Sequence, residues 1–127
     1  MPVEIDDLAR AWILLYETKS KHGNDSPESN ALFWAYEALD EACSEHPKRA
    51  LEVIGLISKL TIDDYILANL AAGPLEDLIV GNEEKIIDDI EVLAKKDLHF
   101  RRIIGGVWRN SISQPTWDRL QRAMKEE

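Results

Sequence analysis

The chain has 127 residues, of which 45% are hydrophobic and 31% are charged, and this composition is typical of a folded globular protein rather than a disordered segment. Its length predicts one domain over residues 1–127, large enough to bury a core without disulfides. Its net charge of −9 repels nucleic acid phosphates, which excludes a typical DNA- or RNA-binding protein and favours a basic protein as partner.

The charge is unevenly distributed along the chain. Residues 1–46 hold 10 acids and 3 bases, a net charge of −7, whereas residues 97–127 hold 4 acids and 6 bases, a net charge of +2. An acidic N-terminal part would attract a basic partner over a long range. The alternative is a charged surface that only keeps the protein soluble.

Targeting signals and covalent cross-links are not expected. No apolar run reaches the roughly 20 residues of a membrane helix. The start, MPVEIDDLAR, is acidic where a signal peptide is basic, so we expect a cytoplasmic protein without membrane contact. The single cysteine, Cys43, falls on an apolar helical stripe and is expected to be a small buried side chain.

Helical periodicity dominates the first half of the sequence. It predicts a first helix over about residues 3–21, followed by a polar loop over about residues 22–30. Ser26 and Pro27 have the spacing of an N-cap and a first helical residue, so a second helix is expected to begin there. A proline restricts the residue before it, so the chain should turn near His46 and start a third helix at Pro47.

The second half continues the helical pattern with shorter segments. Thr61 and Asp64 resemble a capping pair for a fourth helix, and Gly73 is placed to end that helix with a positive φ. A short helix over 75–80 would then end at Gly81. Later helices are expected after Asn82, Asp97 and Ser113, each of which is a good N-cap residue. The predicted fold is all-α, with seven or eight short helices in antiparallel hairpins and a HEAT-like stack as one arrangement of them.

The sequence lacks the patterns of several kinds of catalytic or cofactor site. Its three histidines are scattered and none belongs to a metal-binding helical motif, so no metal site is expected. It has no phosphate-binding glycine loop and no nucleophile elbow, so no cofactor is expected either. The adjacent acids Glu76 and Asp77 diverge by about 100° on a helix, and they would also suit a helix start electrostatically.

Two segments are candidates for binding. In HFRRIIGGVWRN, Arg101 and Arg109 flank Trp108 and could recognise a carboxylate, or the arginines could pair with the protein's own acids while Trp108 is core. Trp34 lies off the apolar stripe of its helix, with Glu37 and Glu41 three and seven residues later. It is therefore either buried in a helix covered on two sides or an exposed aromatic anchor among acids.

The segments AAGPLEDL and GGVWR resemble those of a family of small bacterial proteins classed as a domain of unknown function, with A-x-G-P-L-E-D-L and G-G-V-W-R motifs. The resemblance covers roughly residues 51–120 and implies a soluble, mainly helical domain without an assigned activity. If the motifs form a shared site, Glu76, Asp77, Trp108 and Arg109 are the residues to test. If they serve folding, they form a helix corner and its packing partner.

Three hypotheses for function follow. The first is a non-catalytic protein-binding module for a basic partner, by analogy with small acidic immunity or antitoxin proteins that bind basic toxins. The second is a small-ligand-binding protein or enzyme that uses Glu76, Asp77 and Arg109. The third is a structural homo-oligomer joined through Trp34.

Overall fold

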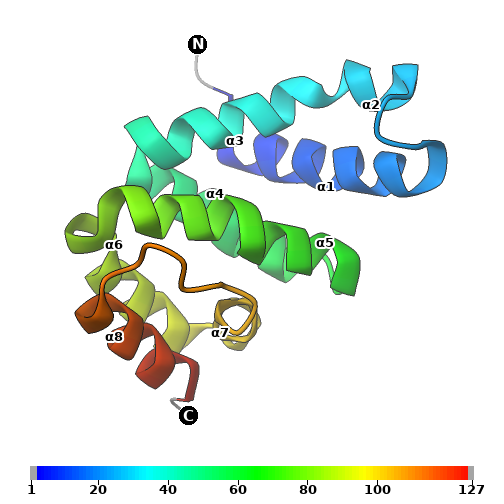
Figure 1. The fold of residues 1–127 in the computed structure, drawn as a ribbon. Coiled ribbons are helices and arrows are strands. Elements are labelled where there is room, and N and C mark those ends of the chain that lie inside the picture. The colour runs from blue at the N-terminus through cyan, green and yellow to red at the C-terminus, as the bar shows by residue number, and fades with distance from the viewer. Residues whose placement is uncertain (1–2, 126–127) are drawn as a thin grey trace.

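The computed structural model describes residues 3–125 and contains only helical elements and their connections within that range (Figure 1). This confirms the predicted all-α fold, whereas the HEAT-like arrangement stays a prediction. The helical elements in chain order are α1 (Ile5–His22), α2 (Pro27–Ala31), α3 (Phe33–Glu45), α4 (Pro47–Leu60), α5 (Asp64–Leu70), the π-helical segment η1 (Ala71–Leu75), α6 (Glu76–Lys96), α7 (Leu98–Ile104) and α8 (Gln114–Lys125).

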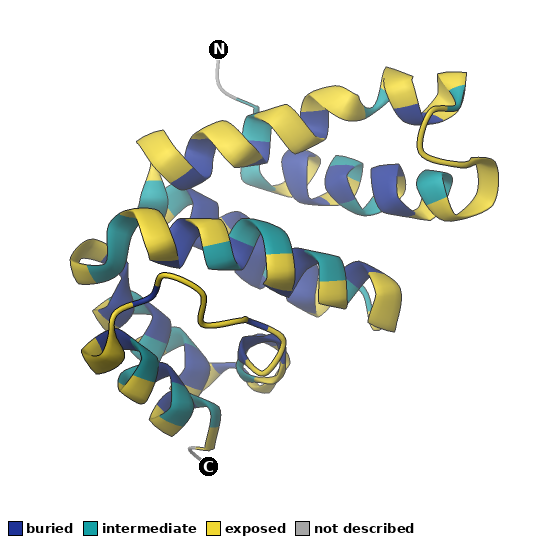
Figure 2. Ribbon diagram, viewed as in Figure 1, coloured by how far each residue is buried: buried dark blue, intermediate teal, exposed yellow. Residues whose placement is uncertain are grey.

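Helix α4 is the centre of the packing, because α1, α3, α6 and α7 all contact it. The hairpin of α1 and α3 lies on one side of the molecule, and α7 and α8 lie on the other, against α6 (Figure 1). The buried residues form stripes along the helices that face this interior (Figure 2). The largest buried side chain is that of Trp12, which is 0% exposed on α1.

Local capping signals set several helix ends as predicted. Pro27 opens α2, and the Ser26 Oγ atom accepts a hydrogen bond from the Ser29 backbone N–H at 3.0 Å. Pro47 opens α4 after a turn at His46, and the Asp97 carboxylate accepts from the first N–H groups of α7. The predicted fourth helix forms as α5, but its predicted cap is wrong, because Asp63 and not Thr61 caps it by accepting from the Ile66 N–H at 3.0 Å.

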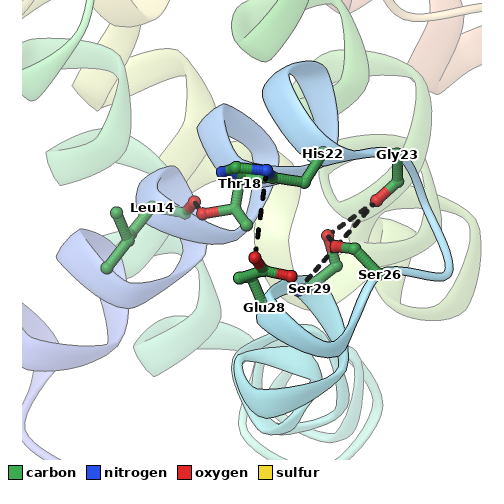
Figure 3. A network of polar contacts seen from close by, with 7 residues as sticks. All are labelled: Leu14, Thr18, His22, Gly23, Ser26, Glu28 and Ser29. Carbon is green, nitrogen blue, oxygen red and sulfur yellow. Dashed lines mark hydrogen bonds and ion pairs between the residues drawn. The ribbon is translucent and has the colours of Figure 1, made fainter.

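The predicted polar loop is shorter than 22–30, because α2 occupies its second half and a break at Leu32 separates α2 from α3. Figure 3 shows the contacts that hold this connection. Gly23 ends α1 with a φ of 91°, and its carbonyl oxygen accepts from the Ser29 hydroxyl at 2.8 Å. His22, once protonated, pairs with Glu28 at 3.9 Å.

The predicted helix corner at Gly73 is wrong. The chain runs from α5 through η1 into α6 without leaving the helical region, and Gly73 does not adopt a positive φ. Pro74 has no N–H to donate and its ring crowds the preceding turn, so an α-helix cannot continue unchanged through it. The helix instead widens by one residue, and the Glu76 N–H donates to the Ala71 carbonyl five residues earlier.

The expected break at Gly81 and Asn82 is a kink inside α6 rather than a gap between two helices. Asn82 has a φ of −145° and a ψ of 33°, outside the helical region. Its side chain does not cap the next turn as predicted, because its Nδ2 atom donates to the carbonyls of Cys43, at 2.8 Å, and Leu78, at 3.0 Å. The kink therefore ties α6 to α3.

Candidate functional site

Trp34 lies on the surface of α3, and its side chain is 42% exposed. The alternative of a doubly buried helix is therefore wrong for this residue. Glu37 and Glu41 are exposed three and seven residues further on, which puts them on the same side of the helix. We call Trp34, Glu37 and Glu41 the α3 outer face.

A pair of aromatic side chains lies on another side of α3. Phe33 is 43% exposed and stacks on Tyr36, with ring centroids 5.3 Å apart and an angle of 17° between the ring planes. Stacked rings hold each other in place and lose little conformational entropy when a partner covers them. Tyr36 is two residues from Trp34, about 200° around the helix, so this ordered pair lies on a different side of α3 from the α3 outer face.

Glu76 joins the two sequence motifs. Its carboxylate accepts hydrogen bonds from the Trp108 backbone N–H, at 3.2 Å, and from the Asn110 side chain, at 2.6 Å. Two helical turns later on α6, the Glu83 carboxylate accepts hydrogen bonds from the Ser113 N–H, at 3.1 Å, and from the Ser113 hydroxyl. These two carboxylates hold the connection between α7 and α8. The Glu76 carboxylate is therefore engaged in structural hydrogen bonds.

The side chains of the second motif do not converge on one pocket with Glu76. Trp108 is 70% exposed, so the interpretation of Trp108 as core is wrong. The Arg109 Nε atom donates to the Ile112 carbonyl at 3.1 Å, within the same connection. The Arg101 Nε atom donates to the Ala94 carbonyl at 3.0 Å and links α7 to the end of α6.

Asp77 faces a different part of the molecule from Glu76. It lines a cleft of about 230 Å³ between α1, α3 and the π-helical segment. We call this hollow the tyrosine cleft. Its lining residues are Tyr16, Tyr36, Asp40, Asn69, Ala72, Gly73, Pro74 and Asp77.

The cleft concentrates negative charge at its rim. Loss of surrounding water, and then repulsion from Asp40 and from Glu76, raise the pKa of the Asp77 carboxyl. Helix-dipole stabilisation does not offset this effect, because η1 precedes α6 and the Glu76 N–H is already hydrogen-bonded. The interpretation of Glu76 and Asp77 as acids at a free helix start is therefore wrong.

Cys43 closes the inner side of the same region. Its thiol donates to the Pro74 carbonyl, with an Sγ–O distance of 3.4 Å, and so satisfies an acceptor of the π-helical segment. Burial, followed by the charges of Asp77 and Asp40, raises the pKa of the thiol to about 12. The thiol is therefore protonated at neutral pH and is a structural donor, not a nucleophile.

Two other kinds of feature are absent from the described residues. Within residues 3–125 no group of three or more histidine, cysteine or acidic side chains is arranged to hold a metal ion. Across that same range no helix is both long and apolar enough to cross a membrane. The cleft instead offers carboxylates, phenol rings and an amide, which are groups that recognise a cation by charge and stacking.

Most residues of the cleft were not among the sequence candidates. Asp77 was, but Tyr16, Tyr36, Asp40 and Asn69 lie on three other helices and carry no motif of their own. The one signal that bore on them was the helical phase of Tyr36 and Asp40, which are four residues apart and so share a side of α3. Only the packing of α3 against η1 brings them to Asp77.

Together these features define a small all-α domain with an acidic, aromatic surface on α3 and an adjoining cleft. The chain belongs to the family of unknown function DUF6869, whose model matches residues 22–127. The match includes the α3 outer face and every residue of the tyrosine cleft except Tyr16, so it extends further toward the N-terminus than the two sequence motifs. No curated protein and no solved structure matches the chain.

Proposed function

We propose that this protein is a non-catalytic binding module whose partner is a basic protein, and that Trp34, Glu37 and Glu41 contact that partner. The observation that carries the proposal is the 42% exposure of Trp34 beside two exposed acids on one helix. Tryptophan is enriched among the residues that dominate binding energy at protein interfaces, where it is buried by the partner.

Charge supports the choice of a basic partner. The chain carries a net charge of −9, and residues 1–46, which include α3 up to its end, carry −7 of it. Such a surface accelerates encounter with a positively charged protein, while the aromatic side chains supply apolar area to bury. By analogy with small acidic proteins that neutralise basic toxins, an immunity or antitoxin role is the form of the proposal that we favour.

The proposal can be tested by affinity capture from the native host with wild-type protein and two tryptophan variants. Trp34→Ala removes the proposed anchor. Trp108→Ala is the matched control, because Trp108 is even more exposed, at 70%, but lies on the connection between α7 and α8. Captured proteins are identified by mass spectrometry, and binding is remeasured for the purified partner at increasing salt.

The supporting result is a basic protein that wild type and Trp108→Ala capture and Trp34→Ala does not. Its affinity should fall by at least about 30-fold for Trp34→Ala, corresponding to about 2 kcal/mol, and should weaken as salt screens the charges. An acidic, salt-insensitive partner, or equal capture by Trp34→Ala, would contradict the proposal. If sedimentation shows that the wild type is a dimer and that Trp34→Ala is a monomer, a homo-oligomer is favoured instead.

The thermal stability of Trp34→Ala separates loss of binding from loss of folding. Truncation of a buried tryptophan lowers the free energy of unfolding by about 3–5 kcal/mol. Because Trp34 is partly exposed, its removal should lower it by less. Trp12→Ala provides that comparison, since Trp12 is fully buried. Equal destabilisation by the two substitutions would mean that Trp34 is a packing residue.

A further inference from the structure

The tyrosine cleft combines aromatic rings with two carboxylates in one hollow beside α3. Tyr36 and Asp40 line it from α3, and Asp77 lines it from the first turn of α6. Within residues 3–125, neither the Asp40 nor the Asp77 carboxylate accepts a hydrogen bond or forms an ion pair. Two carboxylates that repel each other without a shared cation destabilise the free protein and favour a bound cation.

The aromatic wall of the cleft already holds a positive group of the chain itself. The Lys19 ammonium lies 4.9 Å from the centroid of the Tyr16 ring and 6.0 Å from that of the Tyr36 ring. Tyr16 is kept in place by a stack on Trp12, with ring centroids 4.2 Å apart. Tyr16 is only 8% exposed, so its ring is a buried support of the cleft and offers little surface to a second cation. Tyr36 is 38% exposed and stacks on Phe33, so a cation that displaces Lys19 can contact the Tyr36 ring where Phe33 leaves it uncovered.

The size of the cleft selects a side chain over a small molecule. Its volume of about 230 Å³ lies below the roughly 300–1,000 Å³ of pockets that enclose drug-sized ligands. Gly73 forms part of its wall, and a Cβ atom at Gly73 would meet no atom within 4 Å, so the wall is open there. A chain that enters along this wall can place one cationic end between the carboxylates.

A guanidinium group matches the lining better than an ammonium group. Its plane stacks on a phenol ring while its edge donates two parallel hydrogen bonds to a carboxylate. The cleft offers the partly exposed Tyr36 ring and two carboxylates for these contacts, and the Asn69 amide lies beside them. An ammonium ion has no plane to stack and gains less from this arrangement.

We propose that the tyrosine cleft binds the guanidinium group of one arginine side chain of the basic partner, stacked on Tyr36 and paired with Asp40 and Asp77. This inference rests on the proposed function for the identity of the arginine's owner, but the binding chemistry belongs to the cleft alone. Lys19 has to leave the Tyr36 ring when the arginine enters, because both positive groups compete for that ring.

The cleft can be probed without the partner by titrating the full chain with N-acetyl-arginine amide and following its backbone amide signals by NMR. N-acetyl-lysine amide tests the choice of guanidinium, and N-acetyl-citrulline amide is the neutral isostere. The variant Asp40→Asn/Asp77→Asn removes both carboxylates. Its matched control is Asp25→Asn/Glu84→Gln, which removes the same charge from two exposed acids outside the cleft.

The expected result is saturable shifts of cleft amides with the arginine amide, at least threefold weaker binding of the lysine amide, and no binding of citrulline. Asp40→Asn/Asp77→Asn should weaken arginine binding at least fivefold, and the control variant should change it less than twofold. Binding of citrulline, equal binding of lysine, or unchanged binding to the cleft variant would each overturn the inference. A thermal melt of each variant verifies that it is folded.

The two proposals fail in different ways. If a basic partner is captured through Trp34 and the arginine amide does not bind, the cleft inference fails and the proposed function stands. If the arginine amide binds as expected and Trp34→Ala captures the same proteins as wild type, the proposed function fails and the cation site stands.

Discussion

A Cβ atom at Gly106 would lie 2.9 Å from the Cβ atom of Ala71, well inside the contact distance of two carbon atoms. Gly106 of the second motif thus allows the chain after α7 to approach the π-helical segment of the first motif. This contact and the hydrogen bonds of Glu76 to Trp108 and Asn110 join the two segments in this fold.

We therefore expect Gly106→Ala to destabilise the protein by about 1–3 kcal/mol, the usual cost of overpacking. Gly73→Ala is the matched comparison, because a Cβ atom there meets nothing within 4 Å and the backbone is helical. Gly73→Ala should leave stability unchanged or raise it by up to about 1 kcal/mol. Urea unfolding followed by circular dichroism measures both.

The double variant Gly106→Ala/Ala71→Gly identifies the clash itself. Removing the Ala71 methyl group opens the space that the new methyl group needs. The loss of stability in the double variant should therefore be smaller than the sum of the losses in the two single variants. Additive losses would mean that Gly106 is required for a reason other than its contact with Ala71.

The Glu76 contacts predict a local effect on the connection between α7 and α8. Glu76→Ala should cost about 1–2 kcal/mol, because it removes the acceptor of two hydrogen bonds. Hydrogen exchange should accelerate at the Trp108 amide while the Ser113 amide, held by Glu83, stays protected. Glu83→Ala should give the reverse pattern, and exposed Glu84→Ala should change neither amide.

Those parts of the fold that depend on neighbouring residues were predictable from the sequence. Ser26, Pro47 and Asp97 set helix ends through bonds or restrictions within three residues of themselves. The π-helical segment was not predictable in this way. Gly73 and Pro74 forbid an unchanged α-helix but permit either a stop or a widened turn, and the choice is stabilised by Cys43 and Asn82, which act across 31 and 39 residues of sequence.

The same reasoning explains which site residues could be found. Trp34 was recognisable because its position on the helix conflicts with the apolar stripe, which is a local property. Asp40 and Asp77 belong to different helices, and neither differs from the many other acids of this chain until α3 and η1 pack together. A cleft between helices requires their packing to be known, whereas an exposed face of one helix does not.

Charge repulsion in the cleft predicts that Asp77→Asn does not destabilise the protein. The pKa of the folded Asp77 carboxyl is raised, so the native state binds its proton more tightly than the unfolded state does. The charged carboxylate therefore disfavours folding at neutral pH, and this cost is relieved as the pH falls through the folded-state pKa. At pH 7 the melting temperature of Asp77→Asn should equal or exceed that of wild type. A lower value would reveal a native partner that the charged carboxylate stabilises, and Asp25→Asn is the exposed control.

Cys43 predicts a loss of stability at alkaline pH. Burial raises the pKa of its thiol from 9.0 to about 12, so above pH 9 the unfolded chain loses this proton while the native state keeps it. The unfolded state then binds fewer protons, and the free energy of unfolding falls by up to about 1.4 kcal/mol per pH unit between pH 9 and 12. Tyr16, whose pKa is also raised by burial, adds a loss of the same sign.

Cys43→Ala retains the Tyr16 effect and removes that of the thiol, so its unfolding free energy should fall less steeply over this range. Urea titrations of the two proteins measure this difference, and parallel pH profiles would show that the thiol ionises equally in the folded and unfolded states. Rapid reaction of native Cys43 with a thiol reagent at pH 8 would contradict its burial against Pro74.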